Sequence, residues 1–464
     1  MNLKLDKIFK AYDVRGIVGE SINEEVVSAI AAAVVDTLNL NGETIIVGGD
    51  MRPSTQDFAQ AFAQGASARG ANATLIGECS TDQLYFVSGY YKEAAVMFTA
   101  SHNPAEYNGL KMCRAGAVPI SSDDGLYEIR DLAQQYCDKG FETVENPGEI
   151  TRKDTLKDYA QYLRTLVNLS NIRPLKVVVD AGNGMAGKTF PAVLGDQLLP
   201  ALPLDIVPMY FDLDGTFPNH PANPLDPENL KDLKKEVVKQ HADIGLAFDG
   251  DADRCFVVDE TGHDVTPSAI TIMVGIREVD RATAAGESNP TVLHNLITSR
   301  AVPEQLQAAG ASTQETRVGH SFIKADMAKS GAVFGGEHSA HFYFRDFFNA
   351  DSGMLAAMHV LAMLGNQDKP LSQLSAKFNP YFSSGEINSL VEDIPAAVHR
   401  VQKAFKDTTE THTKDGWTFN AKDKQWWFNL RASNTEPFLR LNVEAHTQED
   451  MEKVRDQVLK LIKE

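Results

Sequence analysis

Three polar residues that could do chemistry stand side by side at 101–103, where the sequence reads Ser-His-Asn. They lie in the segment 98–111, FTASHNPAEYNGLK, directly after the apolar run 94–98, which is typical of a buried strand. Pro104 cannot continue a helix, and it biases the residue before it towards an extended backbone. The pattern places Ser101 on a sharp loop at the end of a strand, where α/β sheets position their reactive groups. The alternative is an ordinary surface loop with a turn-forming Asn-Pro pair.

A second turn is predicted directly after this loop, which we call the serine loop (residues 99–106). Asn108 and Gly109 form a pair that favours tight turns. The chain would then return towards the serine loop at Lys111.

Three carboxylates occupy alternate positions in the segment 249–254, DGDADR, which we call the aspartate loop. Alternate side chains of an extended backbone point the same way, so Asp249, Asp251 and Asp253 would repel one another unless a cation lay among them. Ligands that offer only oxygen favour a hard divalent ion, Mg²⁺ before Ca²⁺. The sequence therefore predicts a metal site, with an acidic surface turn as the alternative.

A helix–loop–helix calcium site is a further alternative for the aspartate loop, because Glu260 stands at the twelfth position counted from Asp249. The run from Arg254 to Val258 is apolar and strand-like, however, whereas a calcium loop of that kind carries ligands there. Strands before and after the aspartates instead place the metal site within a fold.

Two segments further along combine charged side chains with glycine. The segment 317–324 contains an arginine, His320 and Lys324 around a glycine, a grouping that suits contact with an anion, although a lone histidine is more often structural. The segment 336–341, GEHSAH, follows an apolar strand. Glu337 in this turn is well placed to accept hydrogen bonds from neighbouring sugar hydroxyls.

The loop 431–437, RASNTEP, has the composition of a phosphate-binding site, and we call it the phosphate loop. It combines the guanidinium of Arg431 with two hydroxyls, an amide and exposed backbone N–H groups, all of which can donate to phosphate oxygens. The alternative is a polar hairpin loop.

Composition sets limits on the class of protein. The chain has 464 residues, of which 43% are hydrophobic and 23% charged, as expected of a globular protein with an ample core. A net charge of −19 disfavours sequence-independent binding of nucleic acid, although local Arg and Lys clusters can still bind an anion. The four cysteines show no CxxC spacing, which argues against a zinc site and a disulfide-rich secreted fold. Neither an apolar signal region nor a run of about 18 apolar residues occurs, so we expect a cytoplasmic location and no membrane partner.

Strands and helices alternate through most of the chain, which predicts α/β units with mostly parallel sheets. From about residue 371 the pattern changes to strands with a terminal helix, which predicts a smaller α+β domain. The predicted helices span 22–40, 55–69, 82–91, 154–167, 229–240, 267–279, 299–309, 393–406 and 447–463. We expect domains at 1–150, 151–255, 256–370 and 371–464, with the strand 256–259 opening the third.

The motifs TASHNP, DGDADR, GEHSAH and RASNTEP together resemble, in order and spacing, those of the α-D-phosphohexomutases. The resemblance covers the whole chain and includes AYDVRG at 11–16 and RVGHSFIK at 317–324. Within that family, GEHSAHFYFRDF at 336–347 is most similar to the bacterial phosphomannomutases. The resemblance implies three related α/β domains with mixed sheets and a C-terminal α+β domain, in a heart shape around a central cleft.

The resemblance also implies a role for each motif. Ser101 would be a phosphoserine, and one of its phosphate oxygens would join Asp249, Asp251 and Asp253 in binding Mg²⁺. The residues expected to stabilise the transferring charge or to move protons are His102, Lys111, Arg254 and His320. The residues expected to bind substrate are Tyr12, Arg15, Arg317, Glu337, His338, Ser339, Arg431, Ser433, Asn434 and Thr435. Where family members often carry a lysine motif after the third-domain strand, this chain has HNLITSR, so that contact would fall to Arg300 or be absent.

The activity that the resemblance implies is reversible phosphoryl transfer between mannose 1-phosphate and mannose 6-phosphate, with a hexose 1,6-bisphosphate as intermediate and activator. The protein would bind only small hexose phosphates, as a monomer or homodimer. A phosphoglucomutase or a dual-specificity phosphohexomutase is the alternative, because no motif visibly reads the hydroxyl that distinguishes the two sugars. A metal-dependent phosphatase with an aspartate nucleophile and a sugar-phosphate sensor without turnover are two further hypotheses.

Overall fold

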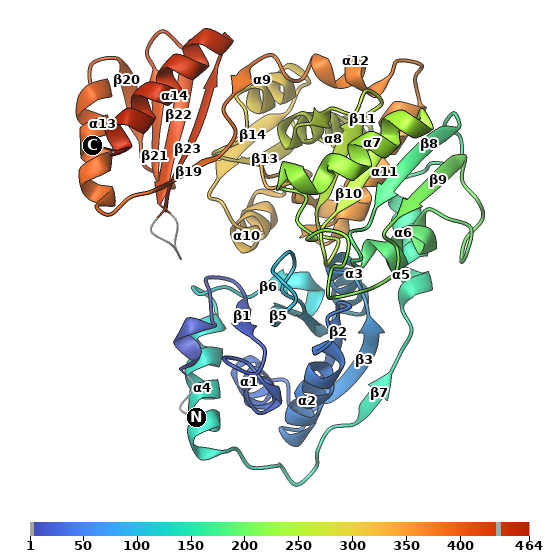
Figure 1. The fold of residues 1–464 in the computed structure, drawn as a ribbon. Coiled ribbons are helices and arrows are strands. Elements are labelled where there is room, and N and C mark those ends of the chain that lie inside the picture. The colour runs from blue at the N-terminus through green and yellow to red at the C-terminus, as the bar shows by residue number, and fades with distance from the viewer. Residues whose placement is uncertain (1–3, 433–437, 464) are drawn as a thin grey trace.

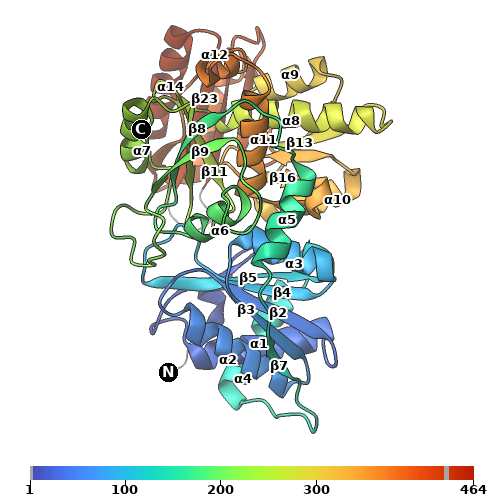
Figure 2. The same cartoon turned by 90° about the vertical axis from the view of Figure 1, so that its right-hand side faces the viewer.

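The strands form four separate sheets, each built from one consecutive stretch of sequence that we call a unit (Figure 1). The computed structural model describes residues 4–432 and 438–463. Each of the first three sheets contains both parallel and antiparallel pairs, whereas the described pairs of the fourth are all antiparallel. This arrangement confirms the predicted fold class. Figure 2 shows the first unit below the others, with α3 and α5 near the joint.

The first unit holds the serine loop. Its elements are η1 (Leu5–Lys7), β1 (Val14–Ile17), α1 (Glu24–Leu38), β2 (Thr44–Gly49), α2 (Thr55–Ala68), β3 (Asn72–Glu78), α3 (Thr81–Tyr91), β4 (Ala94–Phe98), β5 (Tyr107–Arg114), η2 (Ala115–Ala117), β6 (Val118–Pro119), α4 (Leu126–Lys139) and β7 (Ile150–Arg152). The strand order is β1-β5-β4-β2-β3-β7, with β6 beside β5. The serine loop joins the antiparallel neighbours β4 and β5, so it follows a buried strand as predicted.

The turn predicted at Asn108 and Gly109 is wrong, because both residues lie inside β5 and pair with the edge strand β1. Gly109 lies opposite Arg15 in this pair. A Cβ atom on Gly109 would lie 1.9 Å from the carbonyl oxygen of Val14. The glycine therefore permits the close approach of β1 rather than a reversal of the chain.

The second unit holds the aspartate loop between two neighbouring strands. Its elements are α5 (Leu156–Leu166), β8 (Leu175–Asp180), α6 (Ala186–Val193), β9 (Leu204–Met209), η3 (Pro227–Leu230), α7 (Lys231–Gln240), β10 (Ile244–Phe248), β11 (Cys255–Asp259) and β12 (Asp264–Val265). The strand expected to open the third unit instead forms part of β11, which pairs antiparallel with β10. The aspartate loop is thus a short hairpin connection, which holds the next strand in the same sheet. The domain limits themselves stay a prediction.

The third unit repeats the mixed sheet, in the order β14-β13-β15-β16-β17. Its elements are α8 (Pro267–Ala284), β13 (Thr291–Asn295), α9 (Ala301–Ala308), β14 (Ser312–Thr316), α10 (His320–Ser330), β15 (Phe334–Gly336), β16 (Phe342–Phe344), η4 (Arg345–Phe347), β17 (Ala350–Asp351), α11 (Gly353–Gly365) and α12 (Leu371–Ala376). The GEHSAH segment begins at the end of β15 and connects it to β16.

The fourth unit is an antiparallel sheet with two helices. Its elements are β18 (Phe382–Ser383), β19 (Ile387–Leu390), α13 (Ile394–Phe405), β20 (Thr409–His412), β21 (Trp417–Ala421), β22 (Trp426–Ala432), β23 (Phe438–Ala445) and α14 (Gln448–Lys463). The strands β22 and β23 flank the phosphate loop, and they pair directly with each other.

Buried apolar side chains link some units more closely than others. One continuous core runs through the second and third units. The first unit contributes to it from α3 (Leu84, Tyr85 and Phe86) and from the strands of its sheet (Ile46, Ile76 and Met97). A second set of first-unit side chains and the fourth unit form separate cores. Within residues 4–432 and 438–463, none of the helices combines the length and the apolar character that crossing a bilayer requires.

Candidate active site

The Ser101 hydroxyl lies at the meeting of the first and second units. It donates to Asp249 Oδ2 at 2.9 Å, accepts from Arg254 Nη2 at 3.2 Å, and lies 3.2 Å from His102 Nδ1. Ser101 is only 3% exposed, so the alternative of an ordinary surface loop is wrong. Its φ of 50° lies in the left-handed region, which non-glycine residues occupy rarely and often at functional sites.

All three aspartates of the aspartate loop are buried, at 0–1% exposed, which excludes an acidic surface turn. One carboxylate oxygen from each lies within 4.8 Å of the others. Two of these buried carboxylates, Asp251 and Asp253, have an Oδ1 atom without a hydrogen-bond partner among the described residues. Oxygen-only ligands around unsatisfied carboxylate atoms fit a hard cation such as Mg²⁺. Glu260 accepts hydrogen bonds from Ser372 instead, so the calcium-loop alternative is wrong.

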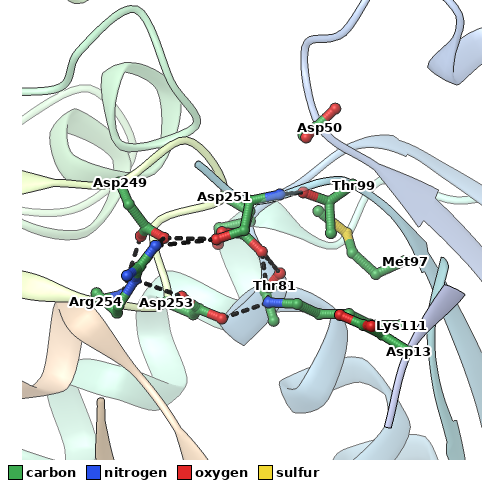
Figure 3. Close-up of polar contacts among 12 residues, drawn as sticks. Asp13, Asp50, Thr81, Met97, Thr99, Lys111, Asp249, Asp251, Asp253 and Arg254 are labelled. Carbon is green, nitrogen blue, oxygen red and sulfur yellow. Dashed lines mark hydrogen bonds and ion pairs between the residues drawn. The ribbon is translucent and has the colours of Figure 1, made fainter. Parts of the chain in front are cut away.

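Two cations face the aspartates (Figure 3). Lys111 Nζ, from β5 of the first unit, lies 2.7 Å from Asp251 Oδ2 and 2.5 Å from Asp253 Oδ2. Arg254 donates through Nε to Asp249 Oδ2 at 2.8 Å. The serine loop, the β5 lysine and the aspartate loop, which the sequence predicted as separate motifs, therefore form one buried cluster.

The two cations do not compensate the three carboxylates equally. Burial raises the pKa of Asp249, more than the Arg254 guanidinium lowers it, and the negative charges of Asp253 and Asp251 add to the rise. Burial also raises the pKa of Asp251, but the Lys111 ammonium, the Thr81 hydroxyl and the Arg254 guanidinium together outweigh burial, and the net shift is downward. Burial lowers the pKa of Lys111, but Asp251 and Asp253 raise it by a larger amount, so Lys111 is protonated here. The cluster therefore has an excess of negative charge that an additional cation would relieve.

Thr81 is a cluster residue that sequence reasoning missed. Its hydroxyl donates to Asp251 Oδ2 at 2.6 Å, and its backbone N–H donates to the Asp251 carbonyl oxygen at 3.0 Å. Thr81 begins α3, and Ser80 caps that helix. The Ser-Thr pair before a helix was a visible signal for a cap, but nothing local indicated that the first turn meets another unit.

Two histidines near the cluster are neutral. Burial lowers the pKa of His102 well below its ordinary value, and the adjacent Arg254 guanidinium, 2.6 Å from its Nδ1, lowers it further. Burial lowers the pKa of His341 to about 3, again with help from Arg254. His341 was not predicted as a site residue, but its Nε2 lies 3.6 Å from Asp253 Oδ1 and its Nδ1 lies 2.9 Å from Ser339 Oγ.

The predicted sugar-binding turn approaches the same cluster through His341. Glu337 is buried and accepts from the Tyr343 hydroxyl at 2.6 Å and from the Gly319 N–H at 3.1 Å. Burial raises the pKa of Glu337, although the Tyr343 hydrogen bond opposes the rise. His338 and Ser339 are half-buried beside it. The turn therefore presents two half-buried polar side chains next to a carboxylate that is already oriented.

Arg15 also reaches the serine loop. Its Nη1 donates to Asn103 Oδ1 at 2.6 Å, and its Nε donates to Asp13 Oδ2 at 2.8 Å. Tyr12, directly before Asp13 on the same segment, is half-buried. The segment 11–16 therefore lies beside the serine loop, although the roles of Tyr12 and Arg15 in binding substrate stay a prediction.

Arg317 lies further out. Its guanidinium covers the Phe322 ring at 4.0 Å from the centroid. It lines a cavity of about 590 Å³ between the first, third and fourth units, to which residues 116–119 and Lys414 also contribute. His320 begins α10, and its side chain lies outside the described part of the structure.

Two residues considered for anion or substrate contacts have partners within the protein. Lys324 is buried, pairs with Asp351 Oδ1 at 2.5 Å and lies over the Tyr85 ring at 3.6 Å, so it serves packing between the third and first units. Arg300 donates to Asn420 Oδ1 at 2.8 Å and to the Lys424 carbonyl, so it connects the third and fourth units. In each case the partner lies far away in the sequence.

Arg431 lies at the start of the phosphate loop with a second arginine beside it. Arg431 and Arg440 are opposite each other in the β22–β23 pair. Glu386 lies 3.6 Å from the Arg431 Nη2 and 3.7 Å from the Arg440 Nη1, and the Nε atoms of both arginines are buried without a described hydrogen-bond partner. Two guanidiniums that share one carboxylate beyond hydrogen-bond distance have N–H donors and positive charge available for an anion. Ser433, Asn434 and Thr435 lie outside the described residues.

Models of four domains of one family match the chain in order. They are the phosphoglucomutase/phosphomannomutase alpha/beta/alpha domains I, II and III, over residues 6–137, 157–262 and 269–381, and the C-terminal domain over residues 386–461. The sheets and the buried cluster described above agree with a family that transfers phosphoryl groups. The chain therefore belongs to the phosphoglucomutase/phosphomannomutase family and is a phosphohexomutase.

Relatives match over nearly the whole chain. A protein of Xanthomonas campestris pv. campestris described as phosphohexose mutases is 40% identical over 440 residues, 94% of each chain. A phosphomannomutase of Escherichia coli strain K12 is 36% identical over 458 residues, 97% of each chain. A solved structure of a phosphoglucomutase/phosphomannomutase family protein from Burkholderia thailandensis is 28% identical with a TM-score of 0.84, and the match covers 98% of this chain and 97% of that one.

Replacing Asp251 with Asn tests the metal site. The substitution removes a charged oxygen ligand, while Lys111 keeps its contact with Asp253 at 2.5 Å, so we expect the protein to stay folded. We expect Mg²⁺ affinity, measured by isothermal titration calorimetry, to fall roughly tenfold or more, with turnover partly recovered at high Mg²⁺. Asp264→Asn, at a half-exposed pair with Lys234 in the same unit, is the control. Equal Mg²⁺ affinity in the parent and Asp251→Asn would exclude the aspartate loop as the metal site.

The low pKa of His341 predicts a pH-dependent stability. The unfolded chain takes up a proton on this histidine below about pH 6.5, whereas the folded protein does not until about pH 3. The free energy of unfolding should therefore fall as the pH falls below 6.5. His341→Asn lacks this titration, so between pH 8 and pH 5 it should lose about 2 kcal/mol less than the parent in denaturant unfolding. Identical losses in the two proteins would contradict the burial of a neutral imidazole.

Proposed function

We propose that this chain interconverts mannose 1-phosphate and mannose 6-phosphate through a phosphoserine and a hexose 1,6-bisphosphate. The observation that carries the proposal is the position of the Ser101 hydroxyl, 2.9 Å from an Asp249 oxygen and 3.2 Å from the Arg254 guanidinium. The relatives from Escherichia coli and Salmonella typhimurium that carry the name phosphomannomutase are 36% identical over nearly the whole chain.

The reaction consists of two phosphoryl transfers. In the first, the bond between phosphorus and Ser101 Oγ breaks and a bond to the free sugar hydroxyl forms, while that hydroxyl gives up its proton and Ser101 Oγ gains one. The resulting bisphosphate then turns over in the site. In the second transfer, the other phosphoryl group leaves its sugar oxygen for Ser101 Oγ, while Ser101 Oγ gives up its proton and the sugar oxygen regains one. Such transfers need alignment and charge stabilisation above all.

The buried cluster supplies both requirements. Asp249, Asp251 and Asp253 would hold Mg²⁺ together with a phosphate oxygen on Ser101. When bound, the ion neutralises negative charge on the transferring phosphoryl group. Arg254 is already directed at the Ser101 hydroxyl and also donates to His102 Nδ1. We assign Arg254 to the phosphoryl oxygens and His102 to the orientation of that guanidinium.

Proton transfer to and from the sugar hydroxyl is assigned to Lys111 or His320. Burial lowers the pKa of Lys111, but its two aspartate partners raise it by more, so the net shift is upward. If those carboxylates bind a metal ion, they compensate Lys111 less and its proton becomes easier to release. His320 is the other candidate, because histidine as a residue type exchanges protons near neutral pH.

The substrate would contact three groups of residues. Glu337 and Ser339 would bind sugar hydroxyls, with His338 beside them. Arg431, Ser433, Asn434 and Thr435 would hold the phosphate that is not reacting. Tyr12, Arg15 and Arg317 would line the space between these groups. The buried Nε atoms of Arg431 and Arg440 have no hydrogen-bond partner among the described residues, which supports an anion at the phosphate loop.

The nearest rival is a phosphoglucomutase or a dual-specificity enzyme, because mannose and glucose differ at one hydroxyl. A comparison of kcat/KM on mannose 1-phosphate and glucose 1-phosphate, with a 1,6-bisphosphate activator, separates these activities. We expect the mannose ester to have the higher kcat/KM. Equal values would establish dual specificity, and no turnover of either ester would exclude a mutase.

Arg431→Ala should affect both substrate affinity and turnover. The loss of a charge-assisted bidentate contact with phosphate costs about 1.5–3 kcal/mol, so KM should rise, and kcat should fall because the sugar is less well aligned. The variant should also require more added 1,6-bisphosphate, because an intermediate that escapes leaves Ser101 without its phosphoryl group. The measurement is rate against activator concentration.

Arg455→Ala is the matched control for this prediction. Arg455 belongs to the same unit but lies on α14, where it contacts only the neighbouring Asp456 among the described ion pairs. Its activator curve should superimpose on that of the parent. If the Arg431→Ala curve also superimposes and its KM is unchanged, the phosphate loop does not hold the phosphate.

A further inference from the structure

Four backbone carbonyl groups in and beside the serine loop accept hydrogen bonds from one side chain, Arg52. A loop buried between two units cannot leave such groups unpaired without a large cost in free energy. The accepting oxygens and their distances from the guanidinium are Ser101 O (3.0 Å), Asn103 O (2.7 Å), Pro104 O (2.7 Å) and Tyr107 O (2.9 Å).

The fifth N–H of the same guanidinium is also occupied. Arg52 Nε donates to Asp50 Oδ2 at 3.2 Å, and the Arg52 backbone N–H donates to Asp50 Oδ1 at 3.0 Å. An arginine side chain has five N–H donors in a rigid plane, so every donor here has an acceptor. Arg52 and Asp50 are 2% and 1% exposed, so their ion pair is buried. The phosphoryl-transfer steps proposed above give neither residue a role.

A loop of the second unit covers Arg52 from the other side. The Phe217 ring centroid lies 5.3 Å from the guanidinium carbon. A Cβ atom on Gly215 would lie 2.7 Å from the Arg52 Cα. At the aspartate loop, a Cβ atom on Gly250 would lie 2.5 Å from the Ser101 carbonyl oxygen. The second unit therefore packs against both the serine loop and the arginine that holds it.

We propose that Arg52 is the positioning residue that fixes the backbone of the serine loop for phosphoryl transfer at Ser101. The proposal rests on the function proposed above. Ser101 holds an unfavourable left-handed φ of 50°. Arg52 donates to the Ser101 carbonyl oxygen, and the Ser101 backbone N–H donates to Thr99 Oγ1 at 2.8 Å. With both sides of the residue fixed, the hydroxyl is directed towards Asp249.

Arg52 acts through the loop and not on the reacting atoms. Its described side-chain contacts are with backbone carbonyls, Asp50 and Phe217, and none is with the Ser101 hydroxyl or the carboxylates of the aspartate loop. Loss of Arg52 should therefore misplace the nucleophile without changing Glu337, Ser339 or the phosphate loop, which lie on the third and fourth units. A misplacement of about 1 Å can lower the rate of such a step about 100-fold.

The test is a graded series at position 52. Arg52→Lys keeps the charge but only three donors on one nitrogen, Arg52→Gln keeps two donors, and Arg52→Met keeps none. We expect kcat per folded molecule to fall roughly 10- to 100-fold across the series, in the order Lys, Gln, Met. KM for the hexose phosphate, at saturating 1,6-bisphosphate, should change less than about twofold. Amide hydrogen exchange of the peptide 99–109 should rise in the same order.

Arg164→Lys is the matched control. Arg164 of α5 also donates to three backbone carbonyls, those of Val193, Gly195 and Pro200, but these belong to the second unit away from the serine loop. The control should lose thermal stability without a change in kcat or in exchange of the peptide 99–109. It thus separates the general cost of losing a carbonyl-binding arginine from the specific effect on Ser101.

Three results would overturn the proposal. The first is parental kcat in folded Arg52→Lys and Arg52→Gln, and the second is a KM that rises in proportion to the fall in kcat. The third is exchange of the peptide 99–109 that stays at the parental level. If the parent itself shows no mutase activity, the proposed function fails, whereas the exchange experiment still decides whether Arg52 fixes the serine loop.

Discussion

The rest of the structure depends on the compensation of five buried charges. Asp249, Asp251 and Asp253 face Lys111 and Arg254 at 2.5–2.8 Å. Buried ions are costly unless paired and hydrogen-bonded, and here the lysine comes from the first unit and the other four from the second. The two units must therefore meet at this point in the folded protein. Three negative and two positive charges leave one uncompensated carboxylate, which suits a site that binds a divalent cation and a transferring phosphoryl group.

The packing of the units agrees with a fixed joint at the buried charges. The second and third units share one apolar core with α3 and part of the sheet of the first, whereas the fourth has a core of its own. The buried charges thus lie at a joint held by continuous packing. The phosphate loop belongs to the separately packed unit, which polar contacts such as those of Arg300 attach to the third. In the proposed reaction one phosphate loop must accept each end of the sugar in turn, and a unit with its own core can adjust without disturbing the charges around Ser101.

Local patterns predicted much of this protein, and long-range contacts account for what they missed. The strand 94–98 was predicted at its observed limits, Ala94–Phe98, because an apolar run and a following Pro specify it locally. Gly109 was assigned to a turn because its partner strand β1 is remote in sequence. Lys324 was assigned to an anion for the same reason, since Asp351 and Tyr85 were not visible as its partners. Arg52 carries no local sign of its role, because its acceptors are backbone atoms.

The most direct test of the account is the identity of the residue that carries the phosphoryl group. The protein is incubated with Mg²⁺ and a hexose 1,6-bisphosphate, digested, and mapped by mass spectrometry under conditions that preserve phosphoserine and acyl phosphate. We expect one phosphoryl group on Ser101 in the parent and none in Ser101→Ala. A phosphoryl group on Asp249 that persists in Ser101→Ala would contradict it, and would identify an aspartate nucleophile in place of the serine.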